Sequence, residues 1–308
     1  MTIVKNTALY TNKHILAPMV RVGTLPMRLL ALDYGADLVY SPEIVDKAII
    51  GTQRTVDEST GTIHYTKGGK LVFQAHPSEK DRLVFQLGTA DPELALQAAQ
   101  LVKQDVAAID LNCGCPKKFS IVSGMGAALL KDPEKLCKIL CTLVENIGLP
   151  VSCKIRLLES TEKTVELCRM IEATGVSALT VHCRTQDERP RDPGHWDQFE
   201  PICQAVTSIP VIANGDFFKH EDAINIRNTT SISSVMFARG AMLNPSVFQP
   251  QGPTTQHEAA QAYIRKAMLV DNLFQNTKYT LMQMYEDTKS DVFQQLTRSK
   301  TIQQIWWV

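Results

Sequence analysis

The sequence has no run of about 18 consecutive apolar residues, which is the length that a membrane-spanning helix requires. A spanning helix is therefore excluded. The stretch Met1–Leu16 also lacks the continuous apolar core and the small-residue cleavage site of a secretory signal peptide. From these two absences we expect a cytoplasmic protein.

The eight cysteines form no Cys-x-x-Cys pair, and the chain carries no excess of either charge. The first absence argues against a zinc site and against a disulfide framework, so no metal is predicted. The 32 basic and 32 acidic residues give a net charge of zero. Because nucleic acid is usually bound by an excess of basic side chains, any RNA binding here would need a local basic patch.

A Gly-x-Gly-x-x-Gly motif is missing after the first apolar run, which argues against a dinucleotide-binding sheet. The chain instead alternates short apolar runs with helix-like segments. Continuous apolar strands that alternate with helices indicate a parallel sheet covered on both faces, and eight of them favour a closed (β/α)8 TIM barrel. The eight runs are residues 14–20, 37–41, 82–88, 107–112, 150–156, 177–183, 209–214 and 232–238.

Two segments depart from this repeat. Residues 51–80, rich in Gly, Thr and Lys, predict an inserted hairpin, and the linker 249–255, with two prolines and a glycine, predicts the end of the barrel. We therefore expect a catalytic barrel over residues 1–248 and a small C-terminal helical domain over 249–308. Its later helices are expected near 279–286 and 292–301.

Cationic side chains stand at the ends of two neighbouring strands, where the catalytic groups of a TIM barrel lie. Lys154 and Arg156 are two residues apart on one face of a strand, and His182 and Arg184 repeat this spacing on the next. Cations that converge on one barrel mouth predict an anion, or an electron-rich ring such as a reduced flavin. The alternative is that they emerge into water at the rim.

Glycine-containing turns follow the seventh and eighth strands, and turns at these two places form the usual phosphate site of a TIM barrel. Ordinary tight turns with a surface arginine are the alternative. At the first and third strand ends, a proline–methionine pair could lie under a flat ring and an amide could bind a pyrimidine-like edge, although core filling and loop capping are equally compatible. The candidate residues are Asn214, Gly215, Asp216, Ala238 and Arg239 in the turns, and Pro18, Met19, Val20 and Gln86 at the other strand ends.

Taken together, these motifs resemble the tRNA-dihydrouridine synthase family. The resemblance runs from residue 13 to about 245 and depends on the order of eight motifs. The stretches 16–28 and 124–130 resemble the eukaryotic branch that acts on position 20 in the D-loop of cytoplasmic tRNA. The motifs are Ala17-Pro18-Met19, Gln86-Leu87-Gly88, Asn112-Cys113-Gly114-Cys115-Pro116, Gly126-Ala127-Ala128-Leu129-Leu130, Lys154-Ile155-Arg156, Val181-His182-Cys183-Arg184, Asn214-Gly215-Asp216 and Ala238-Arg239-Gly240.

The resemblance implies bound FMN, NADPH as reductant, and a tRNA uridine that is extruded from the folded RNA into the pocket. It implies that Lys154 and His182 hold the flavin, that Gln86 and Glu43 lie at its edge, and that Asn112 orients the uracil. The phosphate would lie at Asn214, Gly215, Asp216, Ala238 and Arg239, and contacts to RNA phosphates are predicted for Arg156, Arg184, Lys117 and Lys118.

The resemblance also gives Cys115 a role. Reduction of the C5–C6 bond of uracil needs a hydride at C6 and a proton at C5, and a thiol on the face opposite the flavin can donate that proton. The neighbouring Lys117 and Lys118 are expected to lower its pKa. Cys113 is a decoy that could be a buried packing thiol, and an incidental thiol is the alternative for Cys115.

The sequence departs from the family at Cys183, where the family usually has glycine, so a tighter flavin contact is expected there. Nothing after Ser290 resembles the double-stranded-RNA-binding domain that animal members often carry, and weak tRNA affinity is expected of this chain alone. Two other functions stay open: a flavin barrel that reduces a free small molecule, and a non-catalytic adaptor that keeps the fold and binds a protein through its helical tail.

Overall fold

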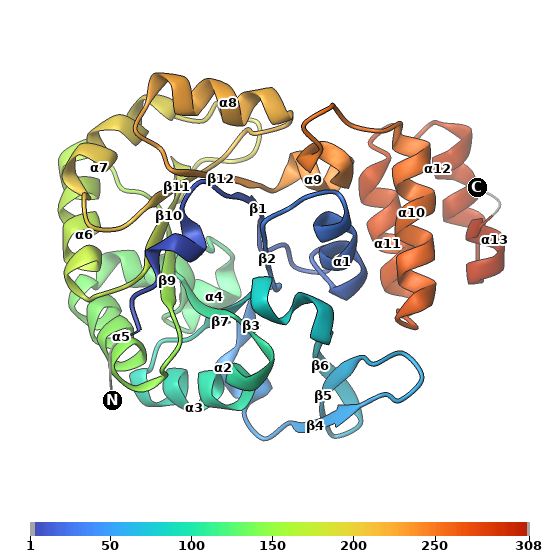
Figure 1. Ribbon diagram of the computed structural model, residues 1–308, viewed down its shortest axis with the longest axis horizontal. Coiled ribbons are helices and arrows are strands. Elements are labelled where there is room, and N and C mark those ends of the chain that lie inside the picture. The colour runs from blue at the N-terminus through green and yellow to red at the C-terminus, as the bar shows by residue number, and fades with distance from the viewer. Residues whose placement is uncertain (1–3, 307–308) are drawn as a thin grey trace.

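Eight parallel strands form a closed barrel in the computed structural model, which describes residues 4–306 (Figure 1). Each strand pairs with the next in the chain, and the last pairs with the first to close the ring. Each of the eight apolar runs coincides with one strand to within a few residues, so the predicted (β/α)8 barrel is confirmed. The strands are β1 (His14–Leu16), β2 (Leu38–Tyr40), β7 (Leu83–Gly88), β8 (Ala108–Asn112), β9 (Val151–Leu157), β10 (Ala178–Thr185), β11 (Val211–Asn214) and β12 (Ser234–Phe237).

Helices cover the outside of the ring. Asp91 and Asp132 cap two of them by accepting backbone N–H groups of the first turn, and a proline follows each cap. The helices of the barrel are α1 (Leu25–Asp33), α2 (Asp46–Ile49), α3 (Pro92–Val102), α4 (Lys118–Val122), α5 (Pro133–Asn146), α6 (Thr161–Ala173), α7 (Phe199–Ala205), α8 (His220–Thr229) and α9 (Arg239–Leu243). Short 3-10 turns are η2 (Pro77–Arg82), η3 (Lys103–Asp105), η4 (Gly126–Lys131), η5 (Trp196–Gln198) and η6 (Pro245–Phe248).

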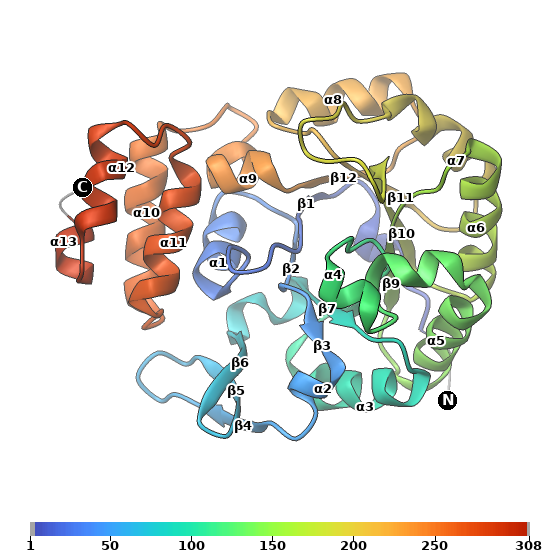
Figure 2. The same ribbon diagram turned by 180° about the vertical axis from the view of Figure 1, so that it is seen from behind.

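The N-terminal end of the ring, which faces the viewer in Figure 1, is closed by η1 (Thr7–Tyr10). The Tyr10 side chain is fully buried and packs with Ile15, Tyr40 and Val84 inside the barrel. A filled interior makes this barrel a packed core rather than a pore. Room for a ligand is therefore expected at the opposite, C-terminal mouth, which Figure 2 faces.

The segment after β2 differs from the predicted hairpin. A two-residue strand, β3 (Ile44–Val45), pairs with β7, and then three antiparallel strands follow: β4 (Gln53–Val56), β5 (Ile63–Lys67) and β6 (Lys70–Ala75). The prediction of a hairpin over residues 51–80 was therefore wrong in the number of strands, because three antiparallel strands are found instead of two. All four residues of β4 are exposed, so that strand has no alternation of apolar and polar residues to reveal it.

Four helices follow the barrel and lie together on one side of it (Figures 1 and 2). They are α10 (Gln256–Leu269), which packs against α1, then α11 (Phe274–Met284), α12 (Asp291–Arg298) and α13 (Ile302–Trp306). Ile305 is buried and Trp306 is partly exposed, whereas Trp307 and Val308 lie outside the described residues. Within residues 4–306, no helix combines the length and the apolar character needed to cross a membrane.

Candidate active site

The strand register brings five of the predicted site residues to the C-terminal mouth. Asn112 is paired with Lys154 across β8 and β9, and His182 with Asn214 across β10 and β11. Gln86 lies on β7, the other neighbour of β8, where it is paired with Asp110. Parallel strands end at the same rim, which is why residues far apart in the sequence meet here.

Asn112 holds the turn that carries the thiol. Its Oδ1 accepts the backbone N–H of Gly114 at 3.0 Å and that of Cys115 at 3.1 Å, and its Nδ2 donates to Gln86 Oε1 at 3.2 Å. The side chain is buried. The resemblance implies that Asn112 orients the uracil. Its Oδ1 is engaged within the protein, whereas the second N–H of Nδ2 has no acceptor among the described residues.

Asp110 is the site residue that sequence reasoning missed. It is fully buried, and its carboxylate accepts Gln86 Nε2 at 2.8 Å and Ser152 Oγ at 2.7 Å. Burial raises the pKa of Asp110 to about 6, although its hydrogen bonds and the nearby Lys154 ammonium act in the opposite direction. Burial also lowers the pKa of Lys154 to about 8. An aspartate inside the apolar run 107–112 was the available signal.

The Cys115 thiol is half-buried at the mouth, and burial raises its pKa above the ordinary value. The backbone N–H and the charge of Lys117 oppose this shift, whereas the Glu43 carboxyl adds to it. Lys117 thus lowers the pKa of Cys115, as expected, but desolvation of the sulfur outweighs this effect and the pKa lies above its ordinary value. A thiol with a raised pKa is protonated at neutral pH, which is the state of a proton donor.

Cys113 is a packing thiol, one of the two alternatives that the sequence left open. Its side chain is fully buried, and its Sγ lies 3.6 Å from Sγ of Cys153 in the neighbouring strand. The strand β8 ends at Asn112, and the turn that follows leaves Cys113 in the core and Cys115 half-buried at the mouth.

The four predicted cations differ in their surroundings. Arg184 is buried and donates to the carbonyl of Asp192 and to the carboxylate of Asp216. Its predicted contact with an RNA phosphate is therefore wrong for the structure described, because the guanidinium is neither exposed nor free. Arg156 is partly exposed, and it donates to the carbonyls of Gly114 at 3.0 Å and Thr185 at 2.8 Å.

Burial, with the charges of Lys154, Arg156 and Arg184, lowers the pKa of His182 to about 2. The imidazole is therefore neutral at physiological pH and can accept as well as donate a hydrogen bond. A neutral histidine surrounded by cations indicates a mouth with positive potential.

The two glycine turns line a small pocket with His182, Asn214 and Arg239. The Asp216 carboxylate in the first turn bridges Arg184 and Arg239, so it is not a phosphate ligand through its side chain, and its backbone takes a positive φ of 60°. A Cβ on Gly240 would lie 2.5 Å from the carbonyl oxygen of Phe217, which shows how closely α9 approaches the turn after β11. Ala238, the residue before α9, lines the same pocket.

The remaining predicted residues lie around the rim. Pro18 and Met19 are partly buried, the Met19 carbonyl accepts the backbone N–H of Gly23 at 2.8 Å, and Val20 is exposed. Glu43 follows β2, and its carboxyl faces the Cys115 thiol. Cys183, at the departure from the family pattern, is buried and its Sγ lies against Gly215.

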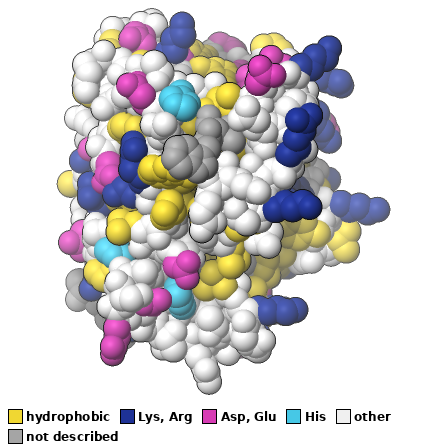
Figure 3. Space-filling view, turned by 90° about the vertical axis from the view of Figure 1, so that its right-hand side faces the viewer, with side chains coloured by type: hydrophobic (Ala, Val, Ile, Leu, Met, Phe, Trp, Pro, Cys, Tyr) yellow, Lys and Arg dark blue, Asp and Glu magenta, His cyan; other side chains and the backbone are white. Residues whose placement is uncertain are grey.

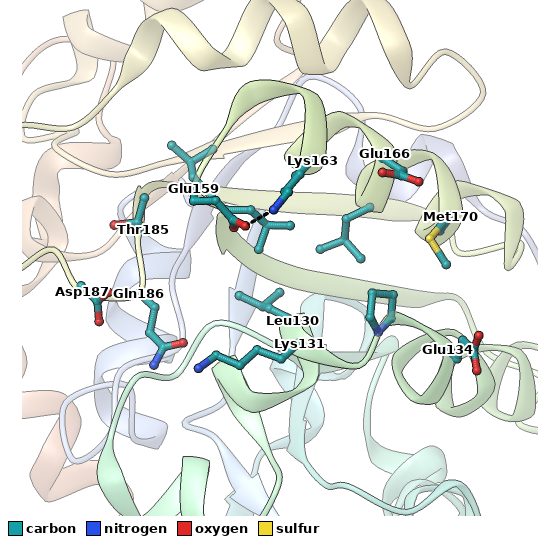
Figure 4. A pocket seen from close by; sticks show the side chains of 14 residues that line it. Leu130, Lys131, Glu134, Glu159, Lys163, Glu166, Met170, Thr185, Gln186 and Asp187 are labelled. Carbon is teal, nitrogen blue, oxygen red and sulfur yellow. Dashed lines mark hydrogen bonds and ion pairs between the residues drawn. The ribbon is translucent and has the colours of Figure 1, made fainter.

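A larger open groove lies beside the mouth, between α5 and α6 (Figure 4). Its floor is apolar, with Leu130 and Met170, and its rim carries charges of both signs, including the ion pair of Glu159 with Lys163. None of the predicted site residues lines it. Among residues 4–306, no three His, Cys, Asp or Glu side chains converge as a metal site.

A family model described as dihydrouridine synthase matches residues 15–304. The chain belongs to the dihydrouridine synthase family. It is 45% identical to the tRNA-dihydrouridine(20) synthase [NAD(P)+] of Schizosaccharomyces pombe, over 96% of this chain and 64% of that protein. It is 41% identical to the Saccharomyces cerevisiae protein of the same name, over 97% of this chain and 83% of the relative. The chain thus spans less than two thirds of the length of the fission yeast member.

Solved structures with low sequence identity share the barrel fold of this dihydrouridine synthase family member. A 2-naphthoyl-CoA reductase complex matches with a TM-score of 0.54 at 12% identity, over 78% of this chain and 49% of that one. A mutant morphinone reductase in complex with tetrahydroNAD matches with a TM-score of 0.50 at 14% identity, over 76% of this chain and 85% of that one. At these identities the likeness concerns the fold alone.

Proposed function

We propose that this chain reduces a uridine in the D-loop of tRNA, at position 20, to 5,6-dihydrouridine, with FMN as bound cofactor and NADPH as reductant. The names of the fission yeast and budding yeast relatives support the substrate, the position and the nicotinamide reductant. The observation that carries the proposal is the Cys115 thiol, protonated and fixed by Asn112 at the mouth of a barrel with cationic strand ends. We also propose that the protein lies in the cytoplasm. The proposed boundary between the barrel and the helical domain falls between residues 248 and 249.

The residues at the mouth fit an FMN. Lys154 and neutral His182 can bind its polar edge, Gln86 has a second N–H on Nε2 that its bond to Asp110 leaves free, and the pocket beside Arg239 suits the phosphate. Met19 and Pro18 border the same mouth from β1. A flavin bound there, reduced by NADPH, supplies the hydride to C6 of the uracil.

Cys115 supplies the proton. Its raised pKa keeps the thiol protonated before the reaction, and the backbone N–H of Lys117 and the charges of Lys154 and Arg156 stabilise the thiolate that remains afterwards. Asn112 contributes by holding the turn, so the sulfur is positioned before substrate arrives.

The RNA reaches the mouth from the solvent side, where Lys117 and Lys118 are exposed and Arg156 is partly so. Figure 3 looks onto the C-terminal helices and shows several Lys and Arg side chains along its right-hand margin, which is the side that faces the viewer in Figure 2. A local concentration of cations of this kind can bind phosphates despite a net charge of zero.

The deciding experiment incubates the protein with unmodified tRNA, FMN and NADPH and maps dihydrouridine. The Cys115→Ala variant is expected to keep flavin reduction by NADPH and to lose transfer to uridine by at least about 100-fold. Cys113→Ala is the matched control and keeps transfer. Full transfer in Cys115→Ala, or loss in Cys113→Ala alone, contradicts the assignment of the acid, and turnover of free uridine without RNA supports a small-molecule reductase instead.

A further inference from the structure

Glu43 is held in a fixed place beside the end of β7. The residues that follow it, Ile44 and Val45, pair with Leu87 and Gly88 in the parallel β3–β7 ladder. A Cβ added to Gly88 would lie 2.6 Å from Glu43 Oε1. The absence of a side chain at Gly88 therefore leaves the slot into which the carboxyl of Glu43 fits.

The carboxyl in this slot lacks the partners that a buried carboxyl usually has. Glu43 Oε1 is buried and accepts no hydrogen bond from any described residue. Burial raises the pKa of Glu43, against the neighbouring Cys115 thiol and the charge of Lys117. A buried polar atom without a partner costs free energy, and such groups are often kept for function.

The loop after Cys115 closes around the same sulfur. Ser120 Oγ is buried without a hydrogen-bond partner, and a Cβ on Gly126, at φ 58°, would lie 2.6 Å from it and 2.7 Å from the Cys115 carbonyl oxygen. The sulfur is thus bordered by the Lys117 N–H, the Ser120 hydroxyl and the Glu43 carboxyl. When the uracil of the substrate also covers a thiol enclosed in this way, protons from solvent reach the sulfur less readily.

Building on the proposed role of Cys115 as the acid, we propose that Glu43 is a further catalytic residue, which returns a proton to the Cys115 sulfur after each turnover. The O–H bond of the neutral carboxylic acid breaks, the S–H bond forms, and the electron pair stays on the Glu43 carboxylate. The carboxylate receives this proton from a hydronium ion at the mouth, which becomes water, once the sulfur has lost its own proton. Glu43 is therefore charged between turnovers and neutral only for the transfer. The transfer runs from the stronger acid to the conjugate base of the weaker one, so it is favourable.

In its charged state Glu43 also keeps Cys115 protonated between turnovers. The charges that face the sulfur from other elements are Lys117, Lys154 and Arg156, all of which favour the thiolate, and Asp110 lies behind Lys154. Glu43 is the carboxyl that opposes them. Removal of its charge should therefore allow these cations to lower the pKa of Cys115.

The first readout needs neither flavin nor RNA. The rate at which iodoacetamide alkylates Cys115, followed by peptide mass spectrometry as a function of pH, gives the pKa of the thiol. Glu43→Gln is expected to move its midpoint down by about one pH unit. Gly88→Ala is expected to do the same by displacing the carboxyl, without changing either reacting residue, whereas Glu58→Gln, an exposed carboxylate in the loop between β4 and β5, leaves the midpoint unchanged.

The second readout separates the two halves of the cycle. In Glu43→Gln, dihydrouridine formed in a single turnover should approach the unaltered yield, while multiple turnover falls at least about 10-fold. In Glu43→Ala, added acetate should restore multiple turnover. A midpoint that does not move in either variant, or normal multiple turnover in Glu43→Gln, overturns the role of Glu43. If the unaltered protein makes no dihydrouridine, the proposed function fails, even where Glu43→Gln shifts the midpoint of Cys115.

Discussion

Asn112 Oδ1 accepts the backbone N–H of Cys115 at 3.1 Å, so the asparagine side chain orders the turn on which the thiol is carried. The same amide donates to Gln86, whose own amide donates to the buried carboxylate of Asp110. The direction of each amide in this chain is therefore fixed at both ends. Asn112 accepts from two backbone N–H groups and donates to Gln86, and Gln86 accepts from Asn112 and donates to Asp110.

If this bond positions the thiol, replacing Asn112 should slow proton transfer more than it weakens binding. Asn112→Ala leaves the N–H groups of Gly114 and Cys115 without their acceptor, and a displaced acid costs up to about 100-fold in rate. Asn112→Asp retains an acceptor for both and should lose less. Rapid mixing of reduced enzyme with tRNA measures the transfer rate at saturating substrate. An Ala variant that transfers at the unaltered rate would show that the turn is ordered without Asn112.

A second expectation concerns the dependence of stability on pH. Burial raises the pKa of Asp110 from 3.8 to about 6. Between pH 3.8 and pH 6 its carboxyl is therefore protonated in the folded state and ionised in the unfolded state. The free energy of unfolding therefore falls as pH rises through this window, by about 3 kcal/mol on the scale of 1.36 kcal/mol per pKa unit. Asp110→Asn cannot titrate and should lack that fall.

Urea denaturation of both proteins at pH 4 and pH 7 measures this difference. His182 and the other titrating groups are common to the two chains, so the difference between the two pH dependences isolates Asp110. Parallel dependences in the two proteins would mean that Asp110 is ionised in the folded state at pH 4.

A third expectation concerns Asp216, whose carboxylate holds two arginines. Asp216→Ala leaves the buried Arg184 guanidinium without its anion, and we expect a loss of about 3 kcal/mol in the free energy of unfolding, together with weaker FMN retention. Asp216→Asn keeps one acceptor oxygen and tolerates the positive φ, so it should lose less. The matched control is Glu159→Ala, which removes an exposed ion pair with Lys163 and should leave stability unchanged. Equal stability of all three variants contradicts the bridging role.

Several features of the site could not be predicted from the sequence for a common reason, which is that a pattern gives the position of a side chain but not its solvent exposure. Lys117 and Lys118 follow Cys115 closely in the sequence, yet desolvation of the sulfur outweighs their charge. Arg184 has the same spacing as Arg156, yet Asp192 and Asp216 from other loops cover it. Gly88 appears in a motif with no sign that its missing side chain makes room for Glu43.

The sequence by itself determined the barrel and the place of the thiol. Eight apolar runs separated by capped helices leave few folds that bury them all, and the motif after the fourth run puts Cys115 at a strand end. The tertiary structure alone decided what surrounds that thiol: Asn112 beneath its turn, Glu43 beside it and Asp110 behind the amide chain. Asn112 and Asp110 lie on β8, whereas Glu43 comes from the segment between β2 and β3. The pKa values depend on desolvation and on charges close in space, which sequence spacing does not record.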